Sequence, residues 1–454
     1  MRHRPASEAQ IGSRDLSFMP SLSRTGRYTF RFHALSAGCE GVVTGVMTLN
    51  DIVLRKTLGA SDAVLTFFVT GQSVGLVFPA LWTDFTRGRY LRSSYLWFGL
   101  LGRLALASLF IAARPLPFAV IIVLTTFMYN ALLPAQNMLF QANYAPAERG
   151  RAFGAARRLL AAALLIAALG AGLLLEWDSH AYRWYSIAVG LIGFAGCALL
   201  YRVRLRRLPG AGRGEALALS PSRRAPPGAL EIPSLAWFRP TALRLASSLA
   251  NPFAGSVRTL RSDRAFLSYE CYFFLYGMAF MMLQPVLPIF LVEYLDVDYS
   301  QAATAKGLIM YGMFILLSPL AGVLSDRAGP VRLAAGAFAL LSLFPSLLCL
   351  TRNVASLYAS FAFYGAAMAA VDVAWNMGPI HFAGERDSTV YMGAHTALVA
   401  IRALIGGPLG IIVMRLAGTP RATFVGAAIL FLAGAAGMRR LAARTAVRRD
   451  ATAG

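Results

Sequence analysis

The chain has 454 residues, of which 57% are hydrophobic and only 14% are charged. Soluble domains carry about 25% charged residues, so this composition excludes both an ordinary soluble globule and a disordered chain. The net charge of +22 would suit a nucleic-acid-binding protein if basic and aromatic side chains shared a surface. Instead, the arginines stand in short gaps between long apolar runs, which indicates a protein embedded in the lipid bilayer with no nucleic-acid partner.

Residues 1–32 are polar and rich in arginine, and no short apolar stretch with a cleavage site precedes the first long apolar run. This pattern predicts a cytoplasmic N-terminal tail. Twelve apolar runs then follow that are each long enough to cross a hydrocarbon core of about 30 Å. The predicted spans cover residues 33–54, 62–83, 93–113, 116–140, 152–175, 183–203, 265–292, 302–324, 330–350, 354–380, 390–416 and 421–438.

One long polar segment, 204–264, divides the spans into two sets of six, within 33–203 and 265–438. Inside it, the stretch 234–249 mixes large apolar residues with arginine, as a helix lying in the membrane interface does. We therefore predict two six-helix bundles joined by a cytoplasmic linker, and a cytoplasmic C-terminal tail over 439–454.

The distribution of basic residues predicts the orientation, because cytoplasmic segments carry an excess of lysine and arginine. If the N-terminus is cytoplasmic, 33 of the 43 basic residues fall in cytoplasmic segments and seven in external ones. The other three, Arg103, Lys306 and Arg402, lie within predicted spans. Both termini are therefore predicted to be cytoplasmic. The preference for arginine over lysine fits a GC-rich bacterial genome, and hence the inner membrane.

The two sets of spans repeat each other. Ala-Gln-Asn-Met at 135–138 and Ala-Trp-Asn-Met at 374–377 end the fourth span of each set, and Gly-Ala pairs at 154 and 393 open the fifth. Both matches have the same offset of 239 residues. A third match places Asp84-Phe-Thr-Arg87-Gly88-Arg opposite the octapeptide Gly322-Val-Leu-Ser-Asp326-Arg327-Ala-Gly329, with Arg332 beyond it.

The octapeptide resembles the G-x-L-x-D-R-x-G loop of the major facilitator superfamily, and the copy near Asp84 is a degraded version of it. The resemblance extends over nearly the whole chain and implies an all-α integral membrane fold of twelve transmembrane helices in two bundles. It also implies transport by alternating access as a monomer, with no cofactor. The well-known drug/proton exchangers of this superfamily have an arginine in span four, whereas residues 116–140 contain no basic residue.

The residues of this loop are candidates for a role in gating. Asp326 ends a span beside several arginines, so it is able to cap a helix or to pair with Arg327 or Arg332 in one state and release them in the other. The alternative is a solvated turn in which Gly329 adopts a positive φ angle. The predicted gating residues are Asp84, Arg87, Gly88, Gly322, Asp326, Arg327, Gly329 and Arg332.

Ionisable side chains inside a membrane are costly, so those within the spans are candidates for solute binding or coupling. Glu40 and Glu270 lie in spans one and seven, and a buried carboxylate of this kind is able to carry a coupling proton. For Glu270 the alternative is a structural pair with Arg264. Asp372 and Asn376 share a helix face, and Asn137 repeats Asn376, so the asparagines either bind solute or join helices.

Arg402 is predicted to lie about 18 Å into its span, near the middle of the membrane. A guanidinium there needs an acidic partner, such as Asp372 or Glu270, or an anionic solute. His395 lies two helical turns earlier on the same face and is suited to relaying protons. The alternative for Arg402 is an ion pair that only joins helices.

These features predict a secondary transporter, coupled to protons, for a small anionic or zwitterionic solute. Direct use of ATP is not expected, because the chain has no G-x-x-x-x-G-K-[ST] loop. An enzyme is not expected, since the best polar group, His381 with Glu385 and Asp387, lacks a recognised catalytic or metal-binding spacing. Efflux of an apolar compound and a non-transporting membrane sensor or scaffold remain the alternatives.

Overall fold

A computed structural model describes residues 22–75, 91–204 and 256–453, except 385 and 387. The first half contains α1 (Arg24–Met47), α2 (Asn50–Ile52), η1 (Val53–Thr57), α3 (Asp62–Val74), α5 (Leu91–Gly102), η3 (Leu104–Ile111), α6 (Pro115–Asn130), α7 (Leu132–Asn143), α8 (Pro146–Trp177) and α9 (Tyr182–Tyr201). The second half contains α12 (Arg264–Ile289), η5 (Phe290–Tyr294), α13 (Tyr299–Ala303), η6 (Thr304–Met310), α14 (Tyr311–Ala328), α15 (Pro330–Leu350), α16 (Val354–Ala383), α17 (Ser388–Ala417) and α18 (Pro420–Ala453).

Eleven helices in the described part of the chain are long and apolar enough to cross a membrane. The predicted span 62–83 begins as α3 and passes out of the described residues after residue 75. The predicted interfacial segment 234–249 also lies outside them. The all-α membrane fold is confirmed, since the described residues form helices and contain no strand.

The first and last helices extend beyond their predicted spans. Helix α1 begins at Arg24 because the Ser23 side chain caps it, accepting a hydrogen bond from Gly26 N at 3.1 Å. Helix α18 continues to Ala453, where the sequence is rich in alanine and arginine, two strong helix formers. Residues 24–32 and 439–453, predicted as parts of polar tails, are therefore helical.

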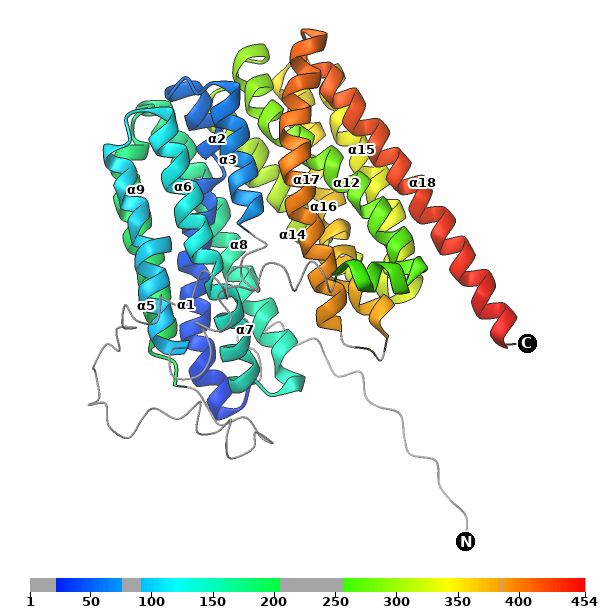
Figure 1. Ribbon diagram of the computed structural model, residues 1–454. Coiled ribbons are helices and arrows are strands. Elements are labelled where there is room, and N and C mark those ends of the chain that lie inside the picture. The colour runs from blue at the N-terminus through cyan, green and yellow to red at the C-terminus, as the bar shows by residue number, and fades with distance from the viewer. Residues whose placement is uncertain (1–21, 76–90, 205–255, 385, 387, 454) are drawn as a thin grey trace.

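The helices form two bundles that stand side by side (Figure 1). In the first, α1 packs against α8 and α9; in the second, α12 packs against α17 and α18, and α15 against α16. The halves meet where α8 contacts α13 and η6, and where α3 contacts α12 and α17. Small residues allow this close approach: a Cβ at Gly172 would meet Ala303, and one at Gly307 would meet Ala168.

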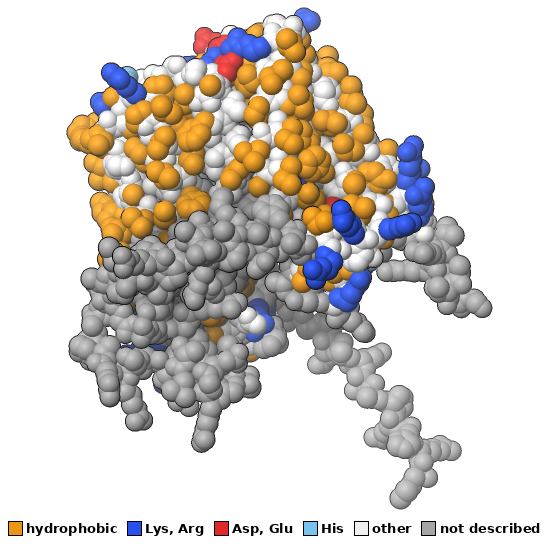
Figure 2. Space-filling model, in the orientation of Figure 1, with side chains coloured by type: hydrophobic (Ala, Val, Ile, Leu, Met, Phe, Trp, Pro, Cys, Tyr) orange, Lys and Arg blue, Asp and Glu red, His pale blue; other side chains and the backbone are white. Residues whose placement is uncertain are grey.

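Hydrophobic side chains cover the flanks of the molecule, and charged side chains gather toward its ends (Figure 2). Large apolar residues are exposed on the surface, including Ile166 at 73% and Leu316 at 69%. A lipid bilayer is the environment that makes such exposure favourable.

Two π-helical turns occupy equivalent positions in the halves. Turn η1 follows the first long helix of the first half, and turn η5 follows the first long helix of the second half. Turns of this kind are rare and often mark functional positions. Both lie at the end of the molecule opposite the start of α1 and the end of α18 (Figure 1).

Candidate functional site

A cavity of about 460 Å³ lies between the two halves. This volume falls in the range of pockets that bind small molecules. The first half contributes residues from α1 to α3, and the second half contributes α12, η6, α14 and α16. The lining residues are Met47, Thr48, Asp51, Phe68, Val69, Gln72, Ser73, Phe280, Gln284, Leu287, Lys306, Met310, Tyr311, Phe314, Phe361, Tyr364 and Met368.

One ion pair belongs to this lining and joins the two halves. Lys306 Nζ on η6 donates to both carboxylate oxygens of Asp51 on α2, at 2.5 and 2.7 Å. The side chains are 14% and 16% exposed, respectively. From the sequence, Lys306 was expected inside a span without an assigned role, and Asp51 was not singled out. The sequence feature that could have indicated this pair was a lysine and an aspartate within predicted spans of opposite halves.

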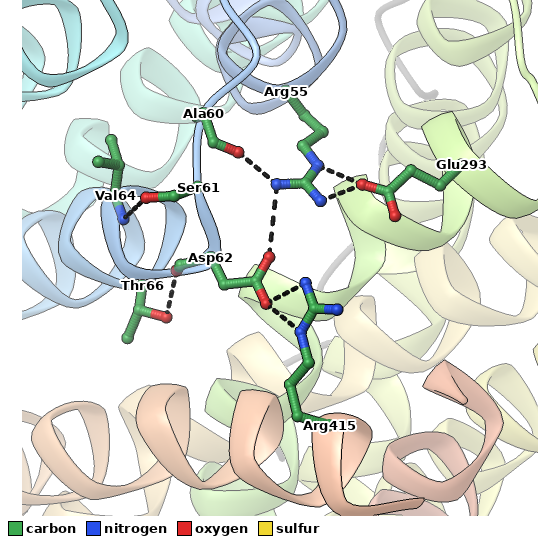
Figure 3. A network of polar contacts seen from close by, with 8 residues as sticks. All are labelled: Arg55, Ala60, Ser61, Asp62, Val64, Thr66, Glu293 and Arg415. Carbon is green, nitrogen blue, oxygen red and sulfur yellow. Dashed lines mark hydrogen bonds and ion pairs between the residues drawn. The ribbon is translucent and has the colours of Figure 1, made fainter. Parts of the chain in front are cut away.

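A network of charged residues joins the two halves (Figure 3). Arg55 on η1 contacts Glu293 on η5, which belongs to the other half. Asp62 at the start of α3 accepts from Arg415 Nε at the end of α17 at 2.5 Å, and its second oxygen lies 3.4 Å from Arg55. Asp62 thus connects arginines from both halves.

Further polar contacts between the halves surround this network. Lys56 Nζ donates to Val297 O at 2.8 Å and lies 3.8 Å from Asp298. The Thr57 hydroxyl contacts the Tyr299 hydroxyl, and Ser300 N donates to Glu176 at 3.3 Å. We call the region formed by residues 55–62, 176, 293–300 and 415 the closed end.

Of the predicted site residues, Glu40 forms an ion pair inside the first bundle. Arg103, predicted to lie in a span, donates to Glu40 Oε1 at 2.5 Å. The guanidinium also stacks over the Tyr129 ring, 3.3 Å from its centroid. Arg103 is 5% exposed, so its charge is compensated by Glu40 and the ring. Glu40 does not line the cavity.

Glu270 and His395 form a buried pair inside the second bundle. His395 Nδ1 lies 2.8 and 3.0 Å from the two Glu270 oxygens, and the side chains are 0% and 2% exposed. Trp375 and Phe273 pack edge-on against the imidazole. The predicted alternative, a pair between Glu270 and Arg264, is wrong because the carboxylate points into the bundle toward α17.

Arg402 lies close to this pair and away from the cavity. It is 4% exposed, and its Nη1 donates to Phe273 O at 3.2 Å. It packs against Gly277, where a Cβ would overlap the arginine side chain. Within the described residues, Arg402 forms no ion pair with an acidic side chain, and its hydrogen bond to Phe273 O joins α17 to α12. Arg402 does not line the cavity.

Asp372, Asn376 and Asn137 lie elsewhere on the interior helices. Asp372 and Asn137 are exposed, and Asn376 is half-buried. Asn376 donates to the Asp372 backbone oxygen at 2.8 Å, within its own helix. Arg157, on α8 of the other half, acts electrostatically on Asp372. None of the three residues belongs to the cavity lining.

The predicted gating loop is only partly described. Asp84, Arg87 and Gly88 lie outside the described residues. In the second copy, Gly329 has φ = 81° and joins α14 to α15, as the turn alternative expects. Asp326 is exposed and forms no ion pair with another described residue. Gly322, Arg327 and Arg332 lie on the two helices that flank this turn.

Comparison with models of protein families identifies the family of this chain. The model of the Major Facilitator Superfamily matches residues 34–314 and 271–453. The chain belongs to the Major Facilitator Superfamily. The resemblance inferred from the loop motif and the internal repeat is thereby confirmed. No curated protein sequence matches the chain.

Solved structures share the fold at low sequence identity. A point mutant of the nucleoside transporter NupG is 14% identical with a TM-score of 0.65, covering 91% of this chain and 99% of that chain. A POT family transporter in complex with a thioalcohol-conjugated peptide is 12% identical with a TM-score of 0.65, covering 90% and 94%. A bacterial homolog of the human lysosomal transporter Spinster, inward-facing and unoccupied, is 16% identical with a TM-score of 0.57, covering 93% and 96%.

Proposed function

We propose that this superfamily member is a proton-coupled secondary transporter that moves a small polar solute by alternating access. The cavity between the halves carries this proposal, because both bundles contribute to its lining and polar contacts seal the closed end beyond it. A solute bound there touches both bundles, so its binding is able to bias their relative position.

The basic residues support a location in the inner membrane with both termini in the cytoplasm. The start of α1 and the end of α18 lie at the same end of the molecule, away from the closed end (Figure 1). With this orientation the closed end faces the outside.

The pair formed by Glu270 and His395 is our proposed proton site. His395 Nδ1 faces the carboxylate at hydrogen-bond distance, so one hydrogen is shared between the imidazole and Glu270. His395 Nε2 is buried and has no hydrogen-bond partner among the described residues. Glu270 lies on α12 and His395 on α17, so the pair joins these two helices.

Reconstitution into liposomes tests both parts of the proposal. A panel of labelled metabolites is offered with and without an inward proton gradient, and proton movement is followed with a pH dye in the lumen. Glu270→Gln should reduce gradient-driven uptake at least tenfold while solute exchange continues without a gradient. His33→Gln is the matched control, because His33 is also buried but contacts the Tyr144 hydroxyl instead of a carboxylate. If wild-type uptake is equal with and without the proton gradient, proton coupling is contradicted, whereas solute transport is not.

The apolar part of the lining favours one alternative, efflux of an apolar compound. Three methionines and four phenylalanines line the cavity, and such side chains adapt to varied apolar ligands. The same liposomes separate the two functions: apolar dyes compete with the polar solute if the alternative is correct.

A further inference from the structure

We infer that the solute is a small zwitterion whose cationic group binds Asp51 and whose anionic group binds Lys306. This inference rests on the proposed transport function and names its solute class. It assigns specificity to two residues of the cavity, in place of the buried Arg402 that the sequence suggested.

The position of the pair provides the first argument. Asp51 is the only acidic residue and Lys306 the only basic residue among the described cavity-lining residues. Both are partly exposed to the cavity, whereas Arg402, Glu270 and His395 are buried behind it. A solute in the cavity therefore meets one positive and one negative group, which together carry no net charge.

The second argument is the cost of separating the pair. Asp51 and Lys306 belong to opposite halves, so opening the closed end pulls them apart. Each group then loses the partner that compensates its charge, which is unfavourable for a largely buried group. A zwitterion inserted between the two groups compensates both charges after they separate. A neutral solute compensates neither charge, and a singly charged solute compensates only one.

The remaining lining suits the body of such a molecule. Thr48, Gln72, Ser73 and Gln284 supply uncharged hydrogen-bonding groups, and the four phenylalanines supply apolar contact. The cavity volume of about 460 Å³ accommodates an amino acid or a short peptide, both of which carry an ammonium and a carboxylate group.

Four probes of nearly equal size isolate the effect of charge: phenylalanine, its amide, its N-acetyl derivative and N-acetylphenylalaninamide. They are, respectively, a zwitterion, a cation, an anion and a neutral molecule. Each is offered to the purified full-length protein, and binding is measured by thermal stabilisation and by competition for uptake into liposomes. Parallel sets built on the other amino acids and on dipeptides cover different side chains.

Wild-type protein should bind the zwitterion of a set at least tenfold more tightly than its other members, a difference of about 1.4 kcal/mol. Lys306→Met leaves Asp51 unpaired and should shift the preference to the amide. Asp51→Asn should shift it to the N-acetyl derivative. Glu293→Gln is the matched control: it also breaks an ion pair between the halves but lies outside the cavity lining, so it should leave the order of the four probes unchanged.

Three results would overturn the inference. The first is that the wild type binds neutral or singly charged probes as tightly as zwitterions. The second is that Lys306→Met and Asp51→Asn keep the wild-type order of the four probes. The third is that Glu293→Gln changes this order as much as Lys306→Met and Asp51→Asn do. In each case transport itself stands. If no probe of any charge binds or is transported, together with the metabolite panel, the proposed function fails as well.

Discussion

Replacing Asp62 with asparagine should loosen the closed end of the protein. Asp62 accepts from Arg415 of the other half and lies near Arg55, which in turn reaches Glu293. The substitution removes the charge that both arginines face and keeps the size of the side chain. The population of molecules open at this end should therefore increase.

The size of the free-energy change follows from how exposed the two arginines that face Asp62 are. Arg415 is 62% exposed, and ion pairs of that kind contribute about 0.2–1 kcal/mol. Arg55 is 13% exposed and keeps Glu293 and Ala60 O as partners, so it adds little to this loss. A total of about 1 kcal/mol corresponds to a roughly fivefold change in the ratio of open to closed molecules.

Distances between spin labels measure this ratio. Labels at Arg114→Cys and Arg352→Cys report on exposed loops of the two halves, after the four native cysteines have been replaced. The longer-distance population should grow about fivefold in Asp62→Asn. In 1 M salt the difference should shrink, because screening then acts within about 3 Å.

Asp178→Asn is the control, since within the described part of the chain Asp178 pairs with His180 of its own half. If wild type and Asp62→Asn have the same distance distribution, the ion network does not hold this end closed. The same follows if Asp178→Asn shifts the distribution as much as Asp62→Asn does.

Two further substitutions test the interior of the bundles. Glu40→Gln leaves the Arg103 charge buried and should lower stability by about 3–5 kcal/mol in detergent unfolding, whereas the additional change Arg103→Gln should recover most of the loss. If the double variant is as unstable as the single one, the pair is not the cause. Gly277→Ala places a Cβ against Arg402 and should lower the melting temperature by several degrees, while Gly312→Ala, whose Cβ meets open space, should not.

The sequence was sufficient to predict the membrane fold because the signals for it are local. Apolar runs and the residues that flank them determine where a helix crosses the bilayer, and equal offsets reveal the repeat. Helix ends were less predictable, as α1 and α18 show, because a serine cap and an alanine-rich stretch extend a helix without adding hydrophobicity.

The site was harder to predict because it depends on which residues of different helices meet. Glu270, His395 and Arg402 were recognised as costly charges, and all three are buried inside a bundle, where Glu270 pairs with His395 and Arg402 donates to Phe273 O. Asp51 and Lys306 lie 255 positions apart. Only the packing of the two halves shows that they meet at a cavity, so their spacing along the chain gave no signal.

The ion pair between Arg55 and Glu293 has a consequence for how such a chain arises. Its members lie 238 positions apart, nearly the period at which the halves repeat, and they occupy the matching π-helical turns η1 and η5. They therefore meet near the axis that relates the halves. Two identical copies would have placed arginine against arginine, or glutamate against glutamate, across that axis, and like charges repel. Attraction here requires the two copies to be encoded separately, so that one is free to become basic and the other acidic. Fusion of duplicated halves into one chain therefore permits an ion pair such as Arg55–Glu293 near the axis, whereas a symmetric dimer of one half does not.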